Sequence, residues 1–564
     1  MRFPFMNVFC AALLAGAAAS NCPAQLSAEQ KAADFRYLAG IYAKQYASYE
    51  WKRTLFGFDA LDIDPWLARA ARTTDDLDFY ELCVEYIANF NDSHVPFVLP
   101  SNFVASLGFT VDIYDGKVLV DSINRTRLPL ARFPFQIGDE LMSVDSRPVA
   151  QLITEFAKYA PASNVRSNRR RAAARIVTRP QSRMPHAVEV GDSAAIEILL
   201  STGQTLTFTV PWLKTGVPMR VGPVPSPKGT PTRSADFAGE DETPEWLQTW
   251  MELQHSAATD LEGELGTGAR APTFALPAGF QQRRGTAPAD FFFSGSYVAE
   301  GLRVGFLRIP SYGSLALSVQ QELDTEIAWF EANTDGLVVD NMRNPGGFLC
   351  LGETIVGRLT PYQFRATGYE LRATWSRVLG FNNALNSARL LNADKWVIDL
   401  YEVLLRDLMQ AYRENRGRTG PIPLCSASID RLPPTDLQGR SLSYTKPLVM
   451  LIDEFSTSTA DSVPAMIQDA KRGRLFGWRT NGAGGTNITP ASGAYSEGAA
   501  GVVLGMMTRK DPLAIAGYPT SHYIENAGVH PDVEYDYMTR ENLLQRGRPF
   551  VDAFTAAILQ DIRR

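Results

Sequence analysis

Ser458 lies at the start of a predicted helix, a setting that suits acyl-transfer chemistry. Residues 447–452 are apolar and predict a buried strand, and residues 458–470 predict the helix that follows it. A serine there lies near the unpaired N–H groups of the first helical turn and the positive end of the helix dipole. These features would stabilise the oxyanion of an acyl-transfer intermediate. The same setting also suits Ser456, Ser458 and Asp461 as helix caps, so this segment alone does not establish a nucleophile.

A second predicted strand ends at a pair of glycines. Residues 336–342 predict a buried strand, and the run Asn-Pro-Gly-Gly at residues 344–347 follows it. Without a Cβ atom, Gly346 and Gly347 would let backbone N–H groups approach a ligand closely. The run therefore suits either an oxyanion-binding loop or an ordinary turn.

The sequence offers few histidines that could act as a base for such a serine. The chain has five. One of them, His94, follows a predicted helix that Pro96 prevents from continuing. A histidine in such a loop has little packing role, and its ordinary pKa suits proton transfer at pH 7. His522 is the competing candidate because it lies close to Glu525 in the sequence.

Three ordered segments resemble the tail-specific, or C-terminal processing, peptidase family S41. Residues 338–347 resemble its D-x-R-x-N-x-G-G signature, residues 456–469 its nucleophile segment, and residues 524–532 its G-x-G-V-x-P-D element. The resemblance implies an α/β fold with a ClpP/crotonase-like catalytic core. It also implies a serine-type peptidase that acts on proteins or peptides, and we expect neither a metal nor a cofactor.

One departure from the family pattern selects a branch within it. Ser–Lys peptidases of the family carry a catalytic lysine beyond the serine, and the corresponding residue here is Ala483, which cannot act as a base. The sequence resembles instead the tricorn-like branch, which uses histidine, and most closely the chlamydial protease-like activity factor group. That group shares the Gly-Ala-Gly-Gly segment that contains Ala483.

The resemblance implies a role for each matched residue. Ser458 matches the nucleophile, His94 the general base and Glu525 the acid that orients the imidazole. Ser93 matches a further serine that bridges Glu525 to His94. The oxyanion hole would combine the N–H of Thr459 with that of Gly346 or Gly347, and the sequence does not decide between the two glycines. A catalytically inactive peptide- or ligand-binding protein on the same fold is the alternative, motivated by the missing lysine.

The elements before the catalytic domain must bring His94 to Ser458. Residues 26–100 predict a helical region, which begins with a capping box at Ser27 and Gln30. Residues 101–214 change to the periodicity of strands, with a hairpin turn at Asp115-Gly116. This region resembles a PDZ domain. The match implies a peptide-binding loop at Leu107, Gly108 and Phe109, next to an open strand edge.

Two segments have an unusual composition: one lies within the PDZ-like region and the other follows it. The basic run at residues 166–183 predicts a solvated helix face, or docking against acidic residues of another domain. Residues 215–293 are rich in Pro, Gly, Ser and Thr and predict a long linker with an exposed proteolysis site at residues 281–284. In place and composition the linker resembles an inhibitory segment removed on activation. Residues 294–564 alternate strands with helices, which predicts a largely parallel sheet and the catalytic domain.

The N-terminus and the overall composition predict an exported protein. Residues 1–25 combine Arg2, a short apolar run and small residues, as in a secretory signal peptide, and no later stretch is long enough to span a membrane. We therefore expect a periplasmic or extracellular protein. The net charge of -6 does not indicate binding to nucleic acid or to an anionic membrane. Cys83 predicts a buried free thiol, while a disulfide among the other cysteines and a homodimer are both left open.

Overall fold

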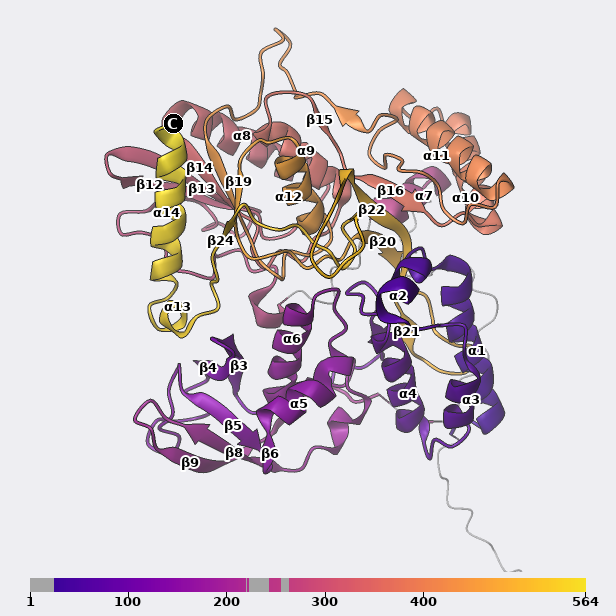
Figure 1. The fold of residues 1–564 in the computed structure, drawn as a ribbon, viewed down its shortest axis with the longest axis vertical. Coiled ribbons are helices and arrows are strands. Elements are labelled where there is room, and N and C mark those ends of the chain that lie inside the picture. The colour runs from indigo at the N-terminus through magenta and orange to yellow at the C-terminus, as the bar shows by residue number, and fades with distance from the viewer. Residues whose placement is uncertain (1–24, 220, 223–242, 255–262) are drawn as a thin grey trace, which may run out of the picture.

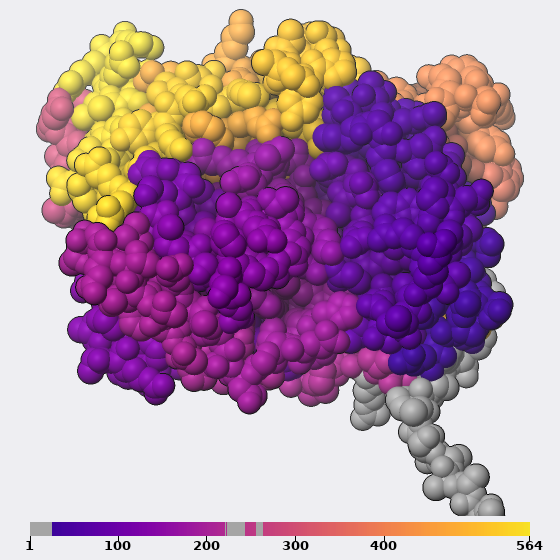
Figure 2. Space-filling view, turned by 60° about the horizontal axis from the view of Figure 1, so that its bottom comes forward, coloured from indigo at the N-terminus to yellow at the C-terminus, as the bar shows by residue number. Residues whose placement is uncertain are grey.

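The computed structural model describes residues 25–219, 221–222, 243–254 and 263–564. The predicted signal peptide therefore lies outside the described residues, except for Gln25. Figure 1 shows three parts: a helical region, a β-rich part that also contains helices, and a larger α/β domain. In Figure 2 the first two parts lie side by side against the α/β domain. In the described residues, no helix combines the length and apolar character needed to cross a membrane.

The N-terminal region is helical, as predicted, and its first helix begins at the capping box of Ser27 and Gln30. Aromatic side chains from the first and last of these helices, among them Phe35, Tyr42 and Tyr86, form its core. Buried residues 502–504 of the α/β domain belong to the same core, so the two parts pack as one body. The helices are α1 (Ala28–Gln45), α2 (Tyr49–Phe56), α3 (Asp64–Ala70) and α4 (Asp76–Ala88).

The β-rich part has a six-stranded sheet in which β3 is an edge strand. The predicted hairpin turn at Asp115-Gly116 is present, because Tyr114 pairs with Lys117 across it. Its main elements are β3 (Phe109–Tyr114), β4 (Lys117–Ile123), β5 (Glu140–Val144), β6 (Arg147–Pro148), α5 (Val149–Phe156), α6 (Val165–Val177), β8 (Ser193–Leu199) and β9 (Thr205–Pro211). A smaller antiparallel sheet contains β2 (Val104–Ser106), β7 (Thr178–Pro180) and β10 (Leu213–Thr215).

The α/β domain is a layered structure built on a seven-stranded sheet, and the predicted parallel pairing holds from β13 to β24. Alternate residues of its strands face opposite layers. In β14, Val338 packs with Phe554 and Ile558 of α14, while Leu337 and Val339 belong to the core on the other face. The strands in spatial order are β11 (Gln281–Arg284), β12 (Phe293–Ala299), β13 (Leu302–Arg308), β14 (Gly336–Asp340), β18 (Leu448–Ile452), β19 (Arg474–Gly477) and β24 (Val533–Glu534).

Helices and a second sheet complete this domain. The second sheet contains β16 (Gly368–Leu371), β20 (Gly485–Ile488), β22 (Val502–Leu513) and β23 (Ser521–Tyr523). The helices are α8 (Leu317–Asn333), α9 (Leu349–Leu359), α10 (Trp375–Leu390), α11 (Lys395–Arg413), α12 (Thr459–Asp469), α13 (Arg540–Leu544) and α14 (Arg548–Ile562). Two-residue strands form two further pairs, β1 (Phe97–Val98) with β21 (Ala499–Ala500), and β15 (Phe364–Arg365) with β17 (Asp430–Arg431).

The linker prediction for residues 215–293 needs a correction in its described parts. Helix α7 (Glu245–Gln254) packs on α11, where the Trp250 and Trp396 rings make an edge contact. Residues 281–284 are strand β11 at the edge of the large sheet, and Arg283 and Arg284 pair with Glu326 of α8. The average composition of the segment did not predict α7 and β11, because only a few aromatic and arginine side chains make their packing contacts.

Candidate active site

Ser458 occupies the turn between β18 and α12 in a strained backbone conformation. Its φ of 64° and ψ of -116° lie in a region that residues other than glycine rarely adopt. The Ser458 N–H donates to Asp461 Oδ2 at 2.7 Å. Its Oγ atom is buried and has no hydrogen-bond partner among the described residues. The turn therefore holds a serine hydroxyl ready at the start of a helix, without using that hydroxyl as a cap.

The Asn-Pro-Gly-Gly loop after β14 lies directly against this serine. A Cβ atom on Gly346 would come within 2.8 Å of Ser458 Cβ, so the close approach requires glycine. The Gly346 N–H donates to Asn344 Oδ1 at 2.9 Å. The N–H groups of Gly347 and Thr459 have no acceptor in the described structure, and Thr459 Oγ1 donates to the Gly347 carbonyl at 2.7 Å. Of the two glycines, Gly347 is thus the one with an available N–H.

Asp461 organises the segment where related enzymes carry the lysine. Its carboxylate accepts the N–H groups of Ser458, Gly482 at 2.8 Å and Ala483 at 3.1 Å. Burial raises the pKa of Asp461 to about 6, although these hydrogen bonds and one from Thr480 oppose the increase. The sequence placed Asp461 only among helix caps. In the structure it joins the nucleophile turn to the Gly-Ala-Gly-Gly segment.

His94 lies in the loop after α4 and is almost fully buried, at 3% exposed. Both of its ring nitrogens lack a hydrogen-bond partner among the described residues, so no hydrogen bond joins the ring to Ser458. Burial lowers the pKa of His94 to about 4; the charge of Asp92 opposes this change and that of Lys52 adds to it. The imidazole is therefore neutral at pH 7, as a general base must be.

Ser93 ties the histidine loop to the nucleophile segment. Its Oγ donates to Asn481 Oδ1 at 2.7 Å, and the Asn481 N–H donates to the carbonyl of Ser456 at 3.0 Å. Ser456 lies two residues before Ser458. The loop that carries His94 and the turn that carries Ser458 are thus connected through one buried asparagine, which the sequence analysis did not identify.

Glu525 is fully buried, and its hydrogen-bond and ion-pair partners differ from those predicted. Its Oε1 atom forms an ion pair with Lys52 and accepts the hydroxyl of Ser163 at 3.2 Å. Its Oε2 atom accepts the N–H of Gly484 at 2.8 Å. Burial raises the pKa of Glu525 to about 7, assisted by the charge of Asp92 and opposed by Lys52. No hydrogen bond from Glu525 to Ser93 or His94 is present in the described structure.

The predicted bridge by Ser93 instead involves Ser163. The Ser163 N–H donates to Ser93 Oγ at 3.0 Å, and the Ser93 N–H donates to Ser163 Oγ at 3.1 Å. Because the Ser163 hydroxyl continues to Glu525, the two serines form a relay from the acid to the residue next to His94. Neither Ser163 nor Lys52 belongs to a sequence motif, and only their position in space connects them with the site.

His522, the competing base, belongs to a different group of side chains. It is partly exposed, and its Nε2 atom lies 3.2 Å from Glu370 Oε1. This contact leaves His94 as the buried, unpartnered histidine near the Ser458 segment.

The predicted peptide-binding loop of the PDZ-like part has two of its amides in use. The Leu107 N–H donates to the carbonyl of Val177 at 3.0 Å, and the Gly108 N–H donates to Ser106 Oγ at 3.2 Å. Phe109 begins the edge strand β3. A cavity of about 780 Å³ lies between β3, α6 and residues 263–275. Peptide binding at Leu107, Gly108 and Phe109 stays a prediction.

The basic run predicted to face solvent or another domain docks on the nucleophile segment. Arg170 of α6 is 2% exposed and pairs with Asp112 at 2.6 Å and with Glu454 at 2.9 Å. Its guanidinium lies 4.4 Å from the centre of the Phe455 ring. Arg166 also pairs with Glu454. The docking alternative is therefore the correct one for these two arginines.

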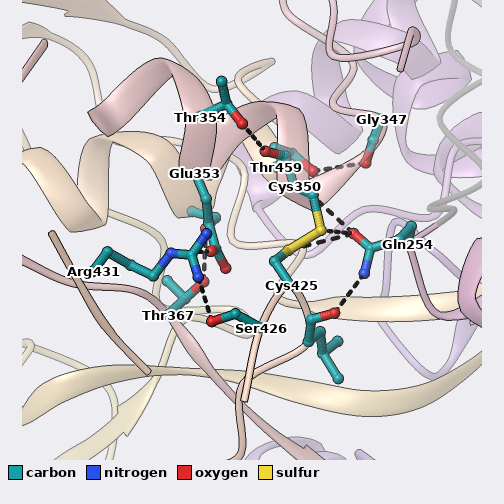
Figure 3. The surroundings of a disulfide bond; sticks show 12 residues. Gln254, Gly347, Cys350, Glu353, Thr354, Thr367, Cys425, Ser426, Arg431 and Thr459 are labelled. Carbon is teal, nitrogen blue, oxygen red and sulfur yellow. Dashed lines mark hydrogen bonds and ion pairs between the residues drawn. A yellow bond between two sulfur atoms is a disulfide. The ribbon is translucent and has the colours of Figure 1, made fainter. Parts of the chain in front are cut away.

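A disulfide fixes the helix that follows the glycine loop. Cys350, in the first turn of α9, is bonded to Cys425, and Cys83 is a buried free thiol as predicted. Gln254 at the end of α7 accepts the Cys350 N–H at 3.1 Å and donates to the carbonyl of Leu424 at 3.0 Å (Figure 3). The bond and the glutamine together hold α9 beside the Gly347–Thr459 contact.

Family comparison identifies the class of protein that this fold and site define. Residues 303–535 match the model of Peptidase family S41, and residues 104–218 match that of a PDZ domain. The catalytic domain is thus a peptidase S41 domain and the protein is a serine-type peptidase with a PDZ domain. The predicted family and the α/β fold class with N-terminal helices are confirmed.

Particular relatives come from chlamydiae. A protein of Chlamydia pneumoniae is 24% identical over 583 residues, which cover 94% of this chain and 90% of that protein. A protein of Chlamydia trachomatis is 24% identical over 592 residues, which cover 95% and 94%. The crystal structure of mature CPAF, the chlamydial protease-like activity factor, has a TM-score of 0.72 at 21% identity and covers 95% of this chain and 98% of that one. The structural match shows that the two chains share a fold.

Proposed function

We propose that this protein is an exported serine endopeptidase in which Ser458 is the nucleophile and His94 is its general base. The observation that carries the proposal is a pair of buried, unpartnered groups: Ser458 Oγ and both ring nitrogens of His94. Buried polar atoms in folded proteins nearly always have a hydrogen-bond partner. Groups left without one, on loops joined through Ser93 and Asn481, fit a site whose missing partner is the substrate.

The proposed reaction proceeds through an acyl-enzyme. Ser458 Oγ attacks the scissile carbonyl carbon while His94 takes the hydroxyl proton, and the N–H groups of Thr459 and Gly347 stabilise the resulting oxyanion. His94 then gives its proton to the leaving amine. Water, deprotonated by His94, attacks the ester and releases the acid product and the free serine. Glu525, in its anionic form, would stabilise the imidazolium by its charge, and the Ser163–Ser93 contacts would hold the acid beside the loop of His94.

Two further observations support export and a protein substrate. Disulfides persist mainly in oxidising compartments, so the Cys350–Cys425 bond fits a periplasmic or extracellular location. The S41 family implies protein or peptide substrates, and the PDZ domain supplies an open strand edge at β3 on which an extended segment could pair.

Active-site labelling tests the proposal. Wild type, Ser458→Ala and His94→Ala are treated with a fluorophosphonate probe and assayed for casein hydrolysis. Ser458→Ala should abolish both signals, and His94→Ala should reduce both by about 1,000-fold because it removes the general base. The control is His186→Ala, which replaces a surface histidine paired with Glu189 and should behave like wild type. One CPAF structure is a complex with lactacystin, which makes lactacystin a second probe.

Two results would overturn the assignment. Labelling that persists in Ser458→Ala would exclude Ser458 as the nucleophile. A wild-type protein that binds peptides tightly but never reacts with the probe would favour the alternative, an inactive binding protein on the same fold.

A further inference from the structure

Lys52 of α2 is a buried lysine whose position no motif explains. It is 2% exposed, and lysines are seldom buried unless they are paired. Its ammonium donates to the carbonyl of Asn91 at 2.9 Å, to Asn526 Oδ1 at 2.8 Å and to Glu525 Oε1. An ammonium group has three protons, so all of its donors are in use.

The partners of Lys52 come from two loops that are far apart in the sequence. We call residues 91–94, which carry His94, the base loop, and residues 525–526 the acid loop. Asn526 Nδ2 also donates to the Asn91 carbonyl, at 2.9 Å. The neighbouring Trp51 donates its indole N–H to the Glu525 carbonyl at 3.1 Å. Helix α2 thus holds both loops with two adjacent side chains.

Lys52 does not replace the family lysine as a base. A lysine accepts a proton only through a lone pair on a neutral amine. Here the nitrogen directs all three protons at oxygen atoms, and two carboxylates, Glu525 and Asp92 at 3.7 Å, form ion pairs with it. The chemistry left to Lys52 is electrostatic and geometric.

The charges around Lys52 show what it compensates. Asp92, which also accepts the hydroxyl of Tyr46 at 2.7 Å and the N–H of His94 at 2.9 Å, comes from the base loop. Glu525 comes from the acid loop. Both carboxylates are fully buried, and Lys52 is the cation in contact with both. Without it, two carboxylates would remain in a low-dielectric interior, where an unpaired charge is strongly unfavourable.

We propose that Lys52 is a positioning residue of the active site: it fixes the base loop to the acid loop and places a positive charge between Glu525 and Asp92. This inference rests on the proposed function, because it assumes that His94 and Glu525 act on Ser458. It assigns to the N-terminal helical region a part in the catalytic geometry beyond carrying the histidine.

The pH dependence of labelling separates this role from a general effect on folding. The second-order rate of fluorophosphonate labelling is measured from pH 4 to pH 8 in wild type and Lys52→Met. We expect labelling about 100-fold slower at pH 7, since small displacements of catalytic groups cost that much. At low pH the labelling rate should fall as His94 becomes protonated, and we call this part of the pH profile the acidic limb. In Lys52→Met we expect the acidic limb to move to higher pH, because loss of the Lys52 charge lets His94 bind a proton more readily.

Lys31→Met is the matched control. Lys31 is buried in the same helical region, at 4% exposed, and donates to Thr73 and Asp75, away from the site. It should leave the acidic limb in place. The positioning role would be overturned if Lys52→Met were labelled as fast as wild type. It would also be overturned if Lys52→Met were labelled slowly but its acidic limb lay at the same pH as that of wild type.

Hydrogen exchange provides a readout that does not depend on activity. Peptides covering residues 90–95 and 523–528 should exchange faster in Lys52→Met but not in Lys31→Met. If wild type never labels, the proposed function fails while the exchange result still decides the positioning role. If Lys52→Met does not fold, the double variant Lys52→Met/Asp92→Asn keeps the net charge. Both loops should then exchange faster than in Asp92→Asn alone, and equal exchange would overturn the inference.

Discussion

At the scale of single residues, the candidate site combines Ser458, which has a strained backbone, with His94 and Glu525, two buried groups whose pKa values are shifted. The backbone of Ser458 has a positive φ that costs about 1–3 kcal/mol for a residue with a side chain. The contacts of Asp461 and Gly346 hold it there. The same contacts leave the buried Oγ without a partner, so the backbone strain and the unpartnered hydroxyl have a common origin.

The strained backbone of Ser458 predicts a difference in stability between two variants at this position. Ser458→Gly should be more stable than Ser458→Ala by about 1 kcal/mol, because glycine adopts the positive φ without a Cβ clash. Both variants should be inactive. Urea denaturation of the two proteins measures the difference, and an alanine variant as stable as the glycine variant would show that the turn is unstrained.

His94 and Glu525 predict opposite pH dependences of stability. The pKa of His94 falls from 6.5 to about 4 on folding, so its contribution is present above pH 6.5 and is lost as the pH falls toward 4. The pKa of Glu525 rises from 4.5 to about 7, so its contribution is present below pH 4.5 and is lost as the pH rises toward 7. Each amounts to about 3 kcal/mol, and between pH 4.5 and 6.5 the two largely cancel.

Single variants should reveal this cancellation. Relative to wild type, His94→Gln should lose stability as the pH rises from 4.5 to 6.5, and Glu525→Gln should gain it. Unfolding free energies from urea titrations at several pH values test the signs. Equal slopes in the two variants would contradict the burial of one of the two groups in its uncharged form.

At the scale of elements, sequence patterns predicted what lies close together along the chain. The strand and helix around Ser458 and the glycine loop after β14 follow from apolar periodicity and from family motifs. Lys52 and Ser163 could not be found in this way, because their partners at Glu525 are more than 350 residues distant and such pairing leaves no local pattern. Helix α7 was missed because its tryptophans are few within a polar segment.

The disulfide at the start of α9 should contribute measurably to the stability of the protein. It closes a loop with a sequence separation of 75 residues, and such a bond typically contributes about 2–4 kcal/mol. A reducing agent should therefore lower the unfolding midpoint of wild type. Cys350→Ser/Cys425→Ser should already be destabilised and should not respond further, since Cys83 is a free thiol. A wild-type midpoint that ignores the reductant would mean that the bond is absent in solution.

At the scale of the whole molecule, all three parts contribute to one site. The helical region supplies His94 and Lys52, the α/β domain supplies Ser458 and Glu525, and the PDZ domain supports Glu454 in the nucleophile segment through Arg170. Contacts between these parts are buried and charged, which couples the stability of each part to the geometry of the site.

Arg170 tests this coupling. Arg170→Met would leave the buried Asp112 without its cation and Glu454 with Arg166 alone, and breaking a buried ion pair typically costs about 3–5 kcal/mol. Fluorophosphonate labelling should slow as well, because Glu454 lies four residues before Ser458. Arg169→Met, at an exposed position one residue earlier, is the matched control and should change neither quantity. Unaltered stability of Arg170→Met would show that the PDZ domain is held by other contacts.

The order of Lys52, His94 and Glu525 along the chain has a consequence during biosynthesis. A ribosome adds residues in order, so Lys52 and His94 exist long before the segment that completes their cluster. A polypeptide that stops before residue 525 has Lys52 and His94 without Glu525, and its Gly484 N–H lacks the carboxylate that accepts it in the complete structure. If Glu525 has its proposed role, we therefore expect hydrolytic activity only after residue 525 has been synthesised and has folded against Lys52 and the loop of His94.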